Sequence, residues 1–223
     1  MTSQTLYVST RNAHKLVELR AMLAAIGPFT LVSAADAGVP DVEEIGETFL
    51  DNAVLKAAAA FAVTGGVCLA DDSGLTVDAL DGAPGVFSAR FSGEGATAAS
   101  NNARLLSTLA ATPDEARGAA FVCQLALLVP APLAASSVEV TPVAHRWLPD
   151  GAVLYALQGR VEGRILRAGR GGEGFGYDPL FLYEPTGLTF AEMSGEAKNA
   201  VSHRGRALTQ LSRCLTEINE AGT

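Results

Sequence analysis

The sequence is poor in lysine and in charge. Only three of its 16 basic residues are lysines, and charged residues make up 18% of the chain. Acidic residues outnumber basic ones, 24 to 16, which gives a formal net charge of −8. Because nucleic-acid binders grip phosphates with excess positive charge, we expect no nucleic-acid partner.

The chain also lacks a long uninterrupted apolar run. Its longest such segment, residues 119–135, contains Gln124, Pro130 and Pro132 and falls short of the roughly 20 apolar residues that a bilayer requires. The first residues show no basic start, apolar run and small-residue cleavage site, so we expect no secretory signal. These features predict a cytoplasmic protein with no membrane partner.

Cysteine is scarce as well. Cys68, Cys123 and Cys214 are an odd number, widely spaced, and each lies among aliphatic residues, which favours buried reduced thiols over disulfides or metal ligands. With 48% hydrophobic residues, the composition excludes a disordered chain and predicts a sizeable core. We expect residues 1–223 to form one domain with two lobes.

Hydrophobic periodicity predicts a mixture of strands and helices. The first half reads as strands at 5–9, 29–33 and 67–70, with an amphipathic helix starting at Leu16 and a second helix over 47–64. The second half reads as a helix over 97–111, strands at 119–129, 138–147 and 153–166 in an antiparallel meander, a glycine-rich loop over 167–179 and a helix over 207–218.

The glycine-rich loop contains a GxGxxG spacing at residues 169–174. A dinucleotide fingerprint would open a helix, whereas Pro179 forces the residue before it out of the helical region. Five glycines within residues 169–176, beside Phe175 and Tyr177, fit a loop that approaches a ligand closely. A flexible surface turn is the alternative.

A second candidate site is residues 10–15, between the first predicted strand and the helix that follows it. Free backbone N–H groups and the helix dipole favour an anion at such a position. The segment is not a Walker loop, because no GxxxxGK[ST] motif occurs. Alternatively, Asn12 only caps the helix and Lys15 is solvated.

Carboxylates form a third candidate. Asp71 and Asp72 directly follow the predicted strand 67–70, and Glu43 and Glu44 lie in an acidic turn-forming segment. These hard oxygen ligands suit Mg²⁺, and if the carboxylates converge they require either a metal or an acid/base pair. For Glu43 and Glu44, a solvated acidic turn is the alternative.

Near the C-terminus, Lys198, Ser202, His203 and Arg204 lie within seven positions. Lys198 and Arg204 could neutralise an anionic ligand, and His203 could exchange hydrogen bonds near neutral pH. A helix cap with ordinary surface charge is the other interpretation.

Five blocks of sequence resemble the inosine triphosphate pyrophosphatases, also described as XTP/dITP diphosphatases, non-standard purine NTP pyrophosphatases or the Ham1-like family. They follow the family's order over nearly the whole chain: STRNAHKLVEL at 9–19, EEIGETFLDNAVLKA at 43–57, ADDSGLTVDALDGAPGVFSAR at 70–90, GEGFGYDPLF at 172–181 and SHRGRAL at 202–208. Arg11 departs from the family's usual glycine, and the Pro/Ala-rich stretch 130–142 looks like a variable connection.

The resemblance implies an elongated, two-lobed α/β fold with a mixed central sheet flanked by helices, an active-site cleft between the lobes, and a homodimer. It implies hydrolysis of ITP, dITP and XTP between the α and β phosphates, which cleanses the nucleotide pool. A pyrophosphatase for other nucleotides, such as dUTP, and a sensor that binds nucleotide without hydrolysis are the rival hypotheses.

The resemblance also implies residue roles. Asp72 would be the general base and would share Mg²⁺ with Glu43, with Glu44 as the other candidate for the second ligand. The implied substrate contacts are Thr10, Arg11, Asn12, Ala13, His14 and Lys15 at the triphosphate, Phe175, Gly176, Tyr177 and Asp178 at the base, Lys198, His203 and Arg204 around the pocket, and Ser73, which contacts substrate.

Overall fold

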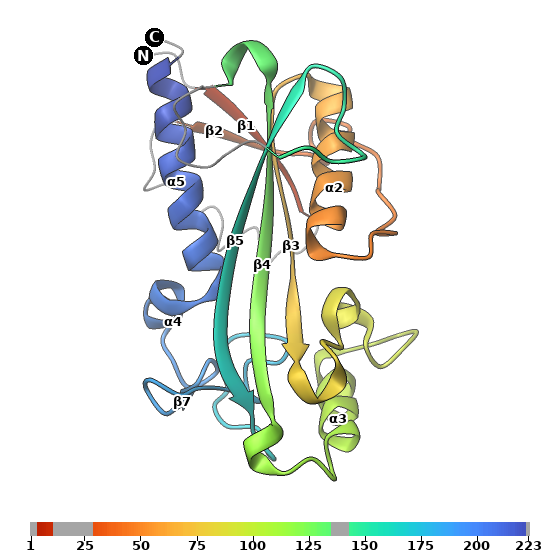
Figure 1. The fold of residues 1–223 in the computed structure, drawn as a ribbon, viewed down its shortest axis with the longest axis vertical. Coiled ribbons are helices and arrows are strands. Elements are labelled where there is room, and N and C mark those ends of the chain that lie inside the picture. Colours follow the sequence, from red (N-terminus) through yellow and green to blue (C-terminus); the bar gives the residue numbers. More distant parts are fainter. Residues whose placement is uncertain (1–3, 11–28, 135–142, 222–223) are drawn as a thin grey trace. The chain divides into compact units, whose positions relative to one another are not determined.

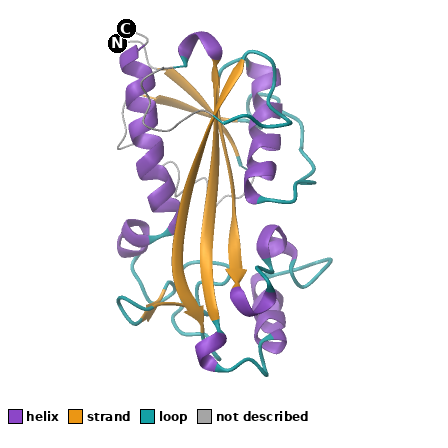
Figure 2. Cartoon of the chain, viewed as in Figure 1, coloured by secondary structure: helices purple, strands orange, loops and turns teal. Residues whose placement is uncertain are grey.

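A computed structural model describes residues 4–10, 29–134 and 143–221. Its strands form one seven-stranded sheet in the order β2-β1-β3-β4-β5-β6-β7, with helices packed against it (Figures 1 and 2). The sheet is mixed, because β1 pairs in parallel with β2 and β3, whereas β6 pairs antiparallel with β5 and β7. The expected α/β class is confirmed.

The elements, in chain order, have the following bounds. The strands are β1 Gln4–Ser9, β2 Phe29–Ser33, β3 Val67–Val77, β4 Gly118–Pro130, β5 Ala152–Ile165, β6 Phe181–Tyr183 and β7 Leu188–Thr189. The α-helices are α2 Phe49–Thr64, α3 Ala98–Thr108, α4 Gly195–Val201 and α5 His203–Ala221, and the 3₁₀ turns are η1 Asp78–Leu80, η2 Gly85–Arg90, η3 Asp114–Ala116 and η4 Ala131–Leu133.

The chain divides into two compact units, each built from separate segments. Unit 1 comprises Met1–Asp72, Gln124–Gln158 and Ala207–Thr223, and unit 2 comprises Ser73–Cys123 and Gly159–Arg206.

In unit 1, α2 packs on the sheet through a face of small side chains. Ala53, Ala57 and Ala60 are fully buried at helical spacing and join a core cluster with residues of β3, β4 and β5. Alanine costs no side-chain entropy and lets the helix approach the sheet closely. In Figure 1, α5 lies on the opposite side of the strands from α2.

In unit 2, aromatic rings fill the core. Phe121 packs against Phe181 and Phe190, with ring centroids 4.7 and 5.7 Å apart, and Phe181 and Phe190 are 5.0 Å apart. Three large rings bury much apolar area with few rotatable bonds, so this cluster gives a rigid base to the loops around it.

Most of the predicted elements are confirmed. The strands at 5–9, 29–33, 119–129 and 153–166, the helices over 47–64, 97–111 and 207–218, and the glycine-rich loop all occur, with small shifts of their ends. The helix predicted from Leu16 lies outside the described residues. The short elements β6, β7 and α4 were not predicted, because two to seven residues are too few to show a period.

Two strand predictions were wrong. The strand predicted at 67–70 continues to Val77, so Asp71 and Asp72 lie inside β3 and do not follow it. Neighbouring strands pair with β3 on both sides, so its polar residues do not end it. Of the strand predicted at 138–147, residues 143–145 have no regular secondary structure, and residues 146–147 form a turn in which the Trp147 N–H donates to the His145 ring. Residues 138–142 lie outside the described residues.

No helix among residues 4–10, 29–134 and 143–221 is both long enough and apolar enough to span a membrane.

Arg117 is a buried cation that ties loop ends together in unit 2. It is 2% exposed, and its guanidinium donates to three carbonyl oxygens: Leu109 at 2.7 Å, Ile165 at 2.8 Å and Leu166 at 3.0 Å. Burial, together with the nearby charge of Arg167, lowers its pKa. The backbone ends of α3 and β5 therefore depend on one side chain.

We expect Arg117→Ala to lower the free energy of unfolding by about 3–4 kcal/mol, because three buried acceptors lose their donor. Urea unfolding measures this. Arg160→Ala is the control, because it removes an exposed ion pair between Arg160 and Glu162. The Arg160 side chain is 44% exposed, and such pairs contribute about 0–1 kcal/mol to stability. Equal losses in the two variants would contradict the role given to Arg117.

Candidate active site

Unit 1 holds a buried carboxylate, Asp72, on β3. Asp72 is 7% exposed and its neighbour Asp71 is 1% exposed. An ionised carboxylate in such a place must be hydrogen-bonded or paired with a cation, because the interior solvates charge poorly. Its described partners come from α2.

Asn52 holds Asp72 from the first turn of α2. The Asn52 side chain is fully buried, and its Nδ2 donates to Asp72 Oδ2 at 3.1 Å. Its Oδ1 accepts the N–H of Gly46 at 2.8 Å. A Cβ at Gly46 would collide with Asp51 and Asn52, so only glycine fits at this position. Asn52 therefore connects Asp72 to the backbone of the acidic segment that contains Glu43 and Glu44.

Lys56, one turn further along α2, supplies the positive charge. Its Nζ lies 2.7 Å from Glu44 Oε1 and 3.6 Å from Asp72 Oδ1. Burial alone would lower the pKa of Lys56, but the carboxylates of Asp72, Asp71 and Glu44 raise it above its ordinary value. Lys56 therefore stays charged at neutral pH and links Asp72 to the acidic segment.

The acidic segment brings only one of its two glutamates into this cluster. Glu44 is half-buried against Lys56, whereas Glu43 is exposed. Thr10, at the end of β1, is half-buried. The other predicted phosphate-loop residues, Arg11, Asn12, Ala13, His14 and Lys15, lie outside the described residues.

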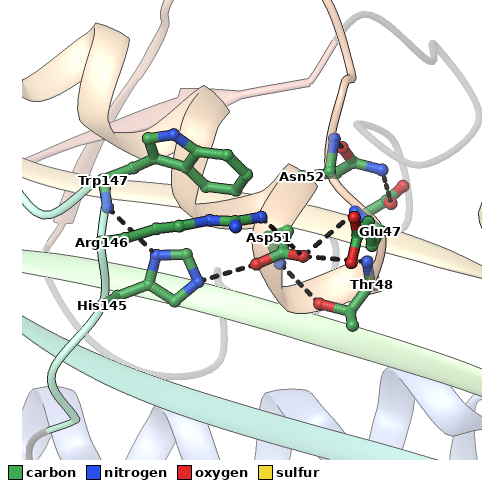
Figure 3. Close-up of polar contacts among 9 residues, drawn as sticks. Glu47, Thr48, Asp51, Asn52, His145, Arg146 and Trp147 are labelled. Carbon is green, nitrogen blue, oxygen red and sulfur yellow. Dashed lines mark hydrogen bonds and ion pairs between the residues drawn. The ribbon is translucent and has the colours of Figure 1, made fainter.

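The N-terminus of α2 is held by a capping box. The Asp51 N–H donates to Thr48 Oγ1, and Asp51 Oδ2 accepts the N–H groups of Glu47 and Thr48, all at 3.1 Å (Figure 3). The backbone and Thr48 hydrogen bonds outweigh burial and lower the pKa of Asp51. His145 and Arg146 reach the same carboxylate from the β4–β5 connection.

Unit 2 holds a second ionic cluster in the glycine-rich loop. Asp178, 3% exposed, accepts from Lys198 Nζ at 2.6 Å and from the Phe175 N–H at 2.8 Å. Lys198 Nζ also lies 4.7 Å from the centre of the Phe175 ring. Gly174 has φ 76°, and a Cβ there would collide with Asp178. The loop thus orients Phe175 around one buried ion pair.

Two further hydrogen bonds fix the same loop. The Tyr177 hydroxyl donates to the Ser88 carbonyl at 2.9 Å, and burial raises the pKa of Tyr177. Asn102 of α3 donates to the Gly176 carbonyl at 3.0 Å. Residues 175–178 are therefore held on both sides by the core of unit 2.

Arg204 and His203 lie at the start of α5 and are 3% and 5% exposed. Arg204 Nη2 donates to Ser73 Oγ at 3.1 Å. The His203 ring stacks on Phe121, with centroids 4.9 Å apart and planes 12° apart. Ser73, His203 and Arg204 thus belong to unit 2, together with Lys198 and residues 175–178.

A sequence profile of the Ham1 family matches residues 6–214. The chain belongs to the Ham1 family. It is 50% identical over 207 residues to the dITP/XTP pyrophosphatase of Geobacter sulfurreducens, covering 92% of this chain and 94% of that protein.

Other relatives agree. The dITP/XTP pyrophosphatase of Exiguobacterium sibiricum is 46% identical over 210 residues, covering 94% of this chain and 96% of that protein. A solved structure of a HAM1 protein from Coxiella burnetii matches with a TM-score of 0.81 and 39% identity, covering 96% of this chain and 99% of that one. Family and fold therefore agree over nearly the full length.

Sequence reasoning missed three residues of the two clusters: Asn52 and Lys56 in unit 1, and Asn102 in unit 2. Asn52 and Lys56 are four residues apart, a spacing that puts both on one face of α2, and Lys56 is one of only three lysines. This spacing was a usable signal. Asn102 gave none, because its partner Gly176 is 74 residues away.

The donor set of unit 1 fits Mg²⁺. Within the described ranges, no group of three or more His, Cys, Asp or Glu side chains is placed to hold a metal. Mg²⁺ usually takes one or two carboxylates and completes its shell with water and substrate phosphates. Asp72 and Glu44, both within 4 Å of one cation, are such a pair.

We expect Lys56→Met to lower the free energy of unfolding by about 2 kcal/mol at pH 7, because two carboxylates lose their cation. Lys56 has a raised pKa in the folded state, so its contribution is complete below the unfolded pKa near 10.5 and is lost as the pH rises through the folded value. Urea unfolding at pH 7 to 11 with EDTA measures this difference.

Lys56→Arg keeps the charge and is the control, with a smaller loss expected at pH 7. If Lys56→Met is as stable as the wild type, or if its deficit does not shrink above pH 10.5, the ion-pair account is wrong.

Proposed function

We propose that this chain hydrolyses the non-standard purine nucleoside triphosphates ITP, dITP and XTP to the monophosphate and pyrophosphate. One observation carries the proposal: a buried carboxylate, Asp72, is held by Asn52 and Lys56 in a chain that is 50% identical to a dITP/XTP pyrophosphatase over almost its whole length. Removing these nucleotides cleanses the precursor pool.

Asp72 is the proposed general base and metal ligand. Hydrolysis of a phosphoanhydride needs neutralised charge and a water molecule aimed at phosphorus, more than it needs covalent chemistry. Mg²⁺, when bound, neutralises phosphate charge and acidifies water. Asn52 donates to Asp72 Oδ2, and Asp72 Oδ1 lies 3.6 Å from Lys56 Nζ.

The second metal ligand is Glu43 or Glu44. Glu44 shares Lys56 with Asp72, which supports it, whereas Glu43 is exposed beside it. Glu43→Gln and Glu44→Gln separate the two, because only the ligand's variant should raise the Mg²⁺ concentration needed for half-maximal activity.

The proposed base-binding residues are those of unit 2. Phe175 offers an aromatic face, which stacks on any base and discriminates little. Specificity for a 6-oxo purine then rests on donors such as Arg204, His203 or backbone N–H groups. An adenine amino group would leave those donors unpaired, a mismatch that can cost factors of about 10⁴.

Lys198 has a narrower role in this proposal than the sequence suggested. Its ammonium donates to Asp178 and lies against Phe175, so the ion pair fixes its position beside the ring. We assign Lys198 to the orientation of Phe175. The predicted contacts at Thr10, Arg11, Asn12, Ala13, His14 and Lys15 remain the proposed triphosphate loop.

We expect Asp72→Asn to reduce turnover of ITP by about 10³-fold, the range typical of a lost general base, while the fold is retained. Asparagine keeps an acceptor for Asn52 but cannot take a proton. Pyrophosphate release and circular dichroism measure the two effects. Asp36→Asn, which changes an exposed carboxylate, is the control. Substantial turnover by Asp72→Asn would rule out the assigned role.

Initial rates of pyrophosphate release from ITP, XTP, GTP, ATP and dUTP, with and without Mg²⁺, test the function itself. We expect fast Mg²⁺-dependent release from ITP and XTP only. A preference for dUTP would indicate a pyrimidine pyrophosphatase, and tight binding without release would indicate a sensor.

We also propose a cytoplasmic homodimer. The resemblance to the family supports the dimer, which sedimentation equilibrium can measure. Cys68, Cys123 and Cys214 are all buried, and none is in a disulfide within the described part of the chain, which suits a reducing compartment.

A further inference from the structure

The β4–β5 connection contacts the N-terminus of α2 through His145. Its Nε2 lies 3.1 Å from Asp51 Oδ1, and the two side chains are only 10% and 14% exposed (Figure 3). The proposed mechanism does not use His145. It lies 94 residues from Asp51 in the sequence, so this contact forms only in the folded protein.

The hydrogen bonds define the role of each ring nitrogen. His145 Nδ1 accepts the N–H of Trp147 at 3.4 Å, so Nδ1 carries a lone pair and the ring proton lies on Nε2. Nε2–H therefore donates to Asp51. Arg146 is a weaker partner of the same carboxylate, because its Nη2 is 3.7 Å from Oδ2 and its side chain is 60% exposed.

Both oxygens of Asp51 are thus engaged. Oδ1 accepts from His145, while Oδ2 accepts the N–H groups of Glu47 and Thr48. The carboxylate cannot rotate without losing one of these bonds. His145 therefore fixes the plane in which Asp51 holds the backbone just before α2.

The same backbone leads to the reaction centre. Glu47 follows Gly46, whose N–H donates to Asn52 Oδ1, and Asn52 Nδ2 donates to Asp72. A continuous series of hydrogen bonds and backbone joins His145, Asp51, Gly46, Asn52 and Asp72; Figure 3 labels His145, Asp51 and Asn52.

We propose that His145 is a positioning residue for hydrolysis: its bond to Asp51 sets where Asn52 holds Asp72. The inference rests on the proposed function, because it assigns Asp72 to the reaction. His145 touches neither Asp72 nor Lys56 in the described contacts, so its effect passes through Asp51 and the α2 N-terminus.

The test compares His145→Ala, His145→Gln and Arg146→Ala by kinetics well below the melting temperature. We expect His145→Ala to lower kcat for ITP about tenfold with little change in KM, because small displacements of a reacting group are costly. Glutamine places an amide N–H near the position of Nε2, so His145→Gln should recover kcat to within about threefold of wild type.

A second readout does not depend on activity. The side-chain amide of Asn52, observed by ¹⁵N NMR, reports its bond to Asp72, and hydrogen exchange at the Gly46 N–H reports its bond to Asn52. We expect His145→Ala to shift the first and speed the second, and His145→Gln to restore both. Arg146→Ala, the matched control, should leave kcat and both signals near wild type, because exposed pairs contribute little.

Three results would overturn the proposal. His145→Ala could lose thermal stability while it keeps kcat and the Asn52 signal, which is what a purely structural residue would do. Arg146→Ala could reduce kcat as much as His145→Ala. His145→Gln could fail to recover either readout. If the wild type releases no pyrophosphate, the proposed function fails, and the Asn52 and Gly46 signals still decide whether His145 controls this series of bonds.

Discussion

Unit 1 depends on one constraint: a carboxylate buried inside a β-strand stays charged only if protein groups replace the bulk water that would otherwise solvate it. Asp72 can remain there because Asn52 gives it a hydrogen bond and Lys56 gives it a nearby cation. Both come from one face of α2, so the helix must start where it does and pack closely on the sheet. The alanine face, the capping box and Gly46 all serve that placement. An unpaired carboxylate would be costly in the protein interior, so the residues that place α2 beside Asp72 are constrained as well.

In unit 2, a buried ion pair likewise holds a loop in place. The Asp178–Lys198 ion pair is more deeply buried than the Lys56–Glu44 pair. It fixes a glycine-rich segment that is not itself a strand of the sheet. Gly174 leaves room for the Asp178 carboxylate, and Phe175 donates its N–H to it. The aromatic core below holds Tyr177. A ligand would therefore meet an aromatic face whose orientation is set before binding, which reduces the entropy lost on association.

The sequence predicted what depends on local pattern. Helix α2, strands β1, β2, β4 and β5 and the glycine-rich loop follow from periodicity and composition. Asp72, Asp178 and Lys198 were predicted as site residues from motifs, and the structure places all three in buried polar clusters. It could not show that β3 runs on through Asp72, because that depends on the neighbouring strands. Nor could it show the turn at His145–Trp147, whose partner Asp51 is remote in sequence. Interactions between distant segments have no local signature.

The division of the chain into interleaved segments has a consequence for its biosynthesis. Unit 1 takes its first part from residues before Ser73 and its last part from residues after Arg206, and unit 2 is assembled from the segments between them. During translation the ribosome therefore releases every segment of unit 2 before it releases the last helix of unit 1. The sheet of unit 1 therefore lacks α5 until this last helix has been released, so unit 1 is the unit that stays incomplete longest and is exposed longest to chaperones and to proteolysis.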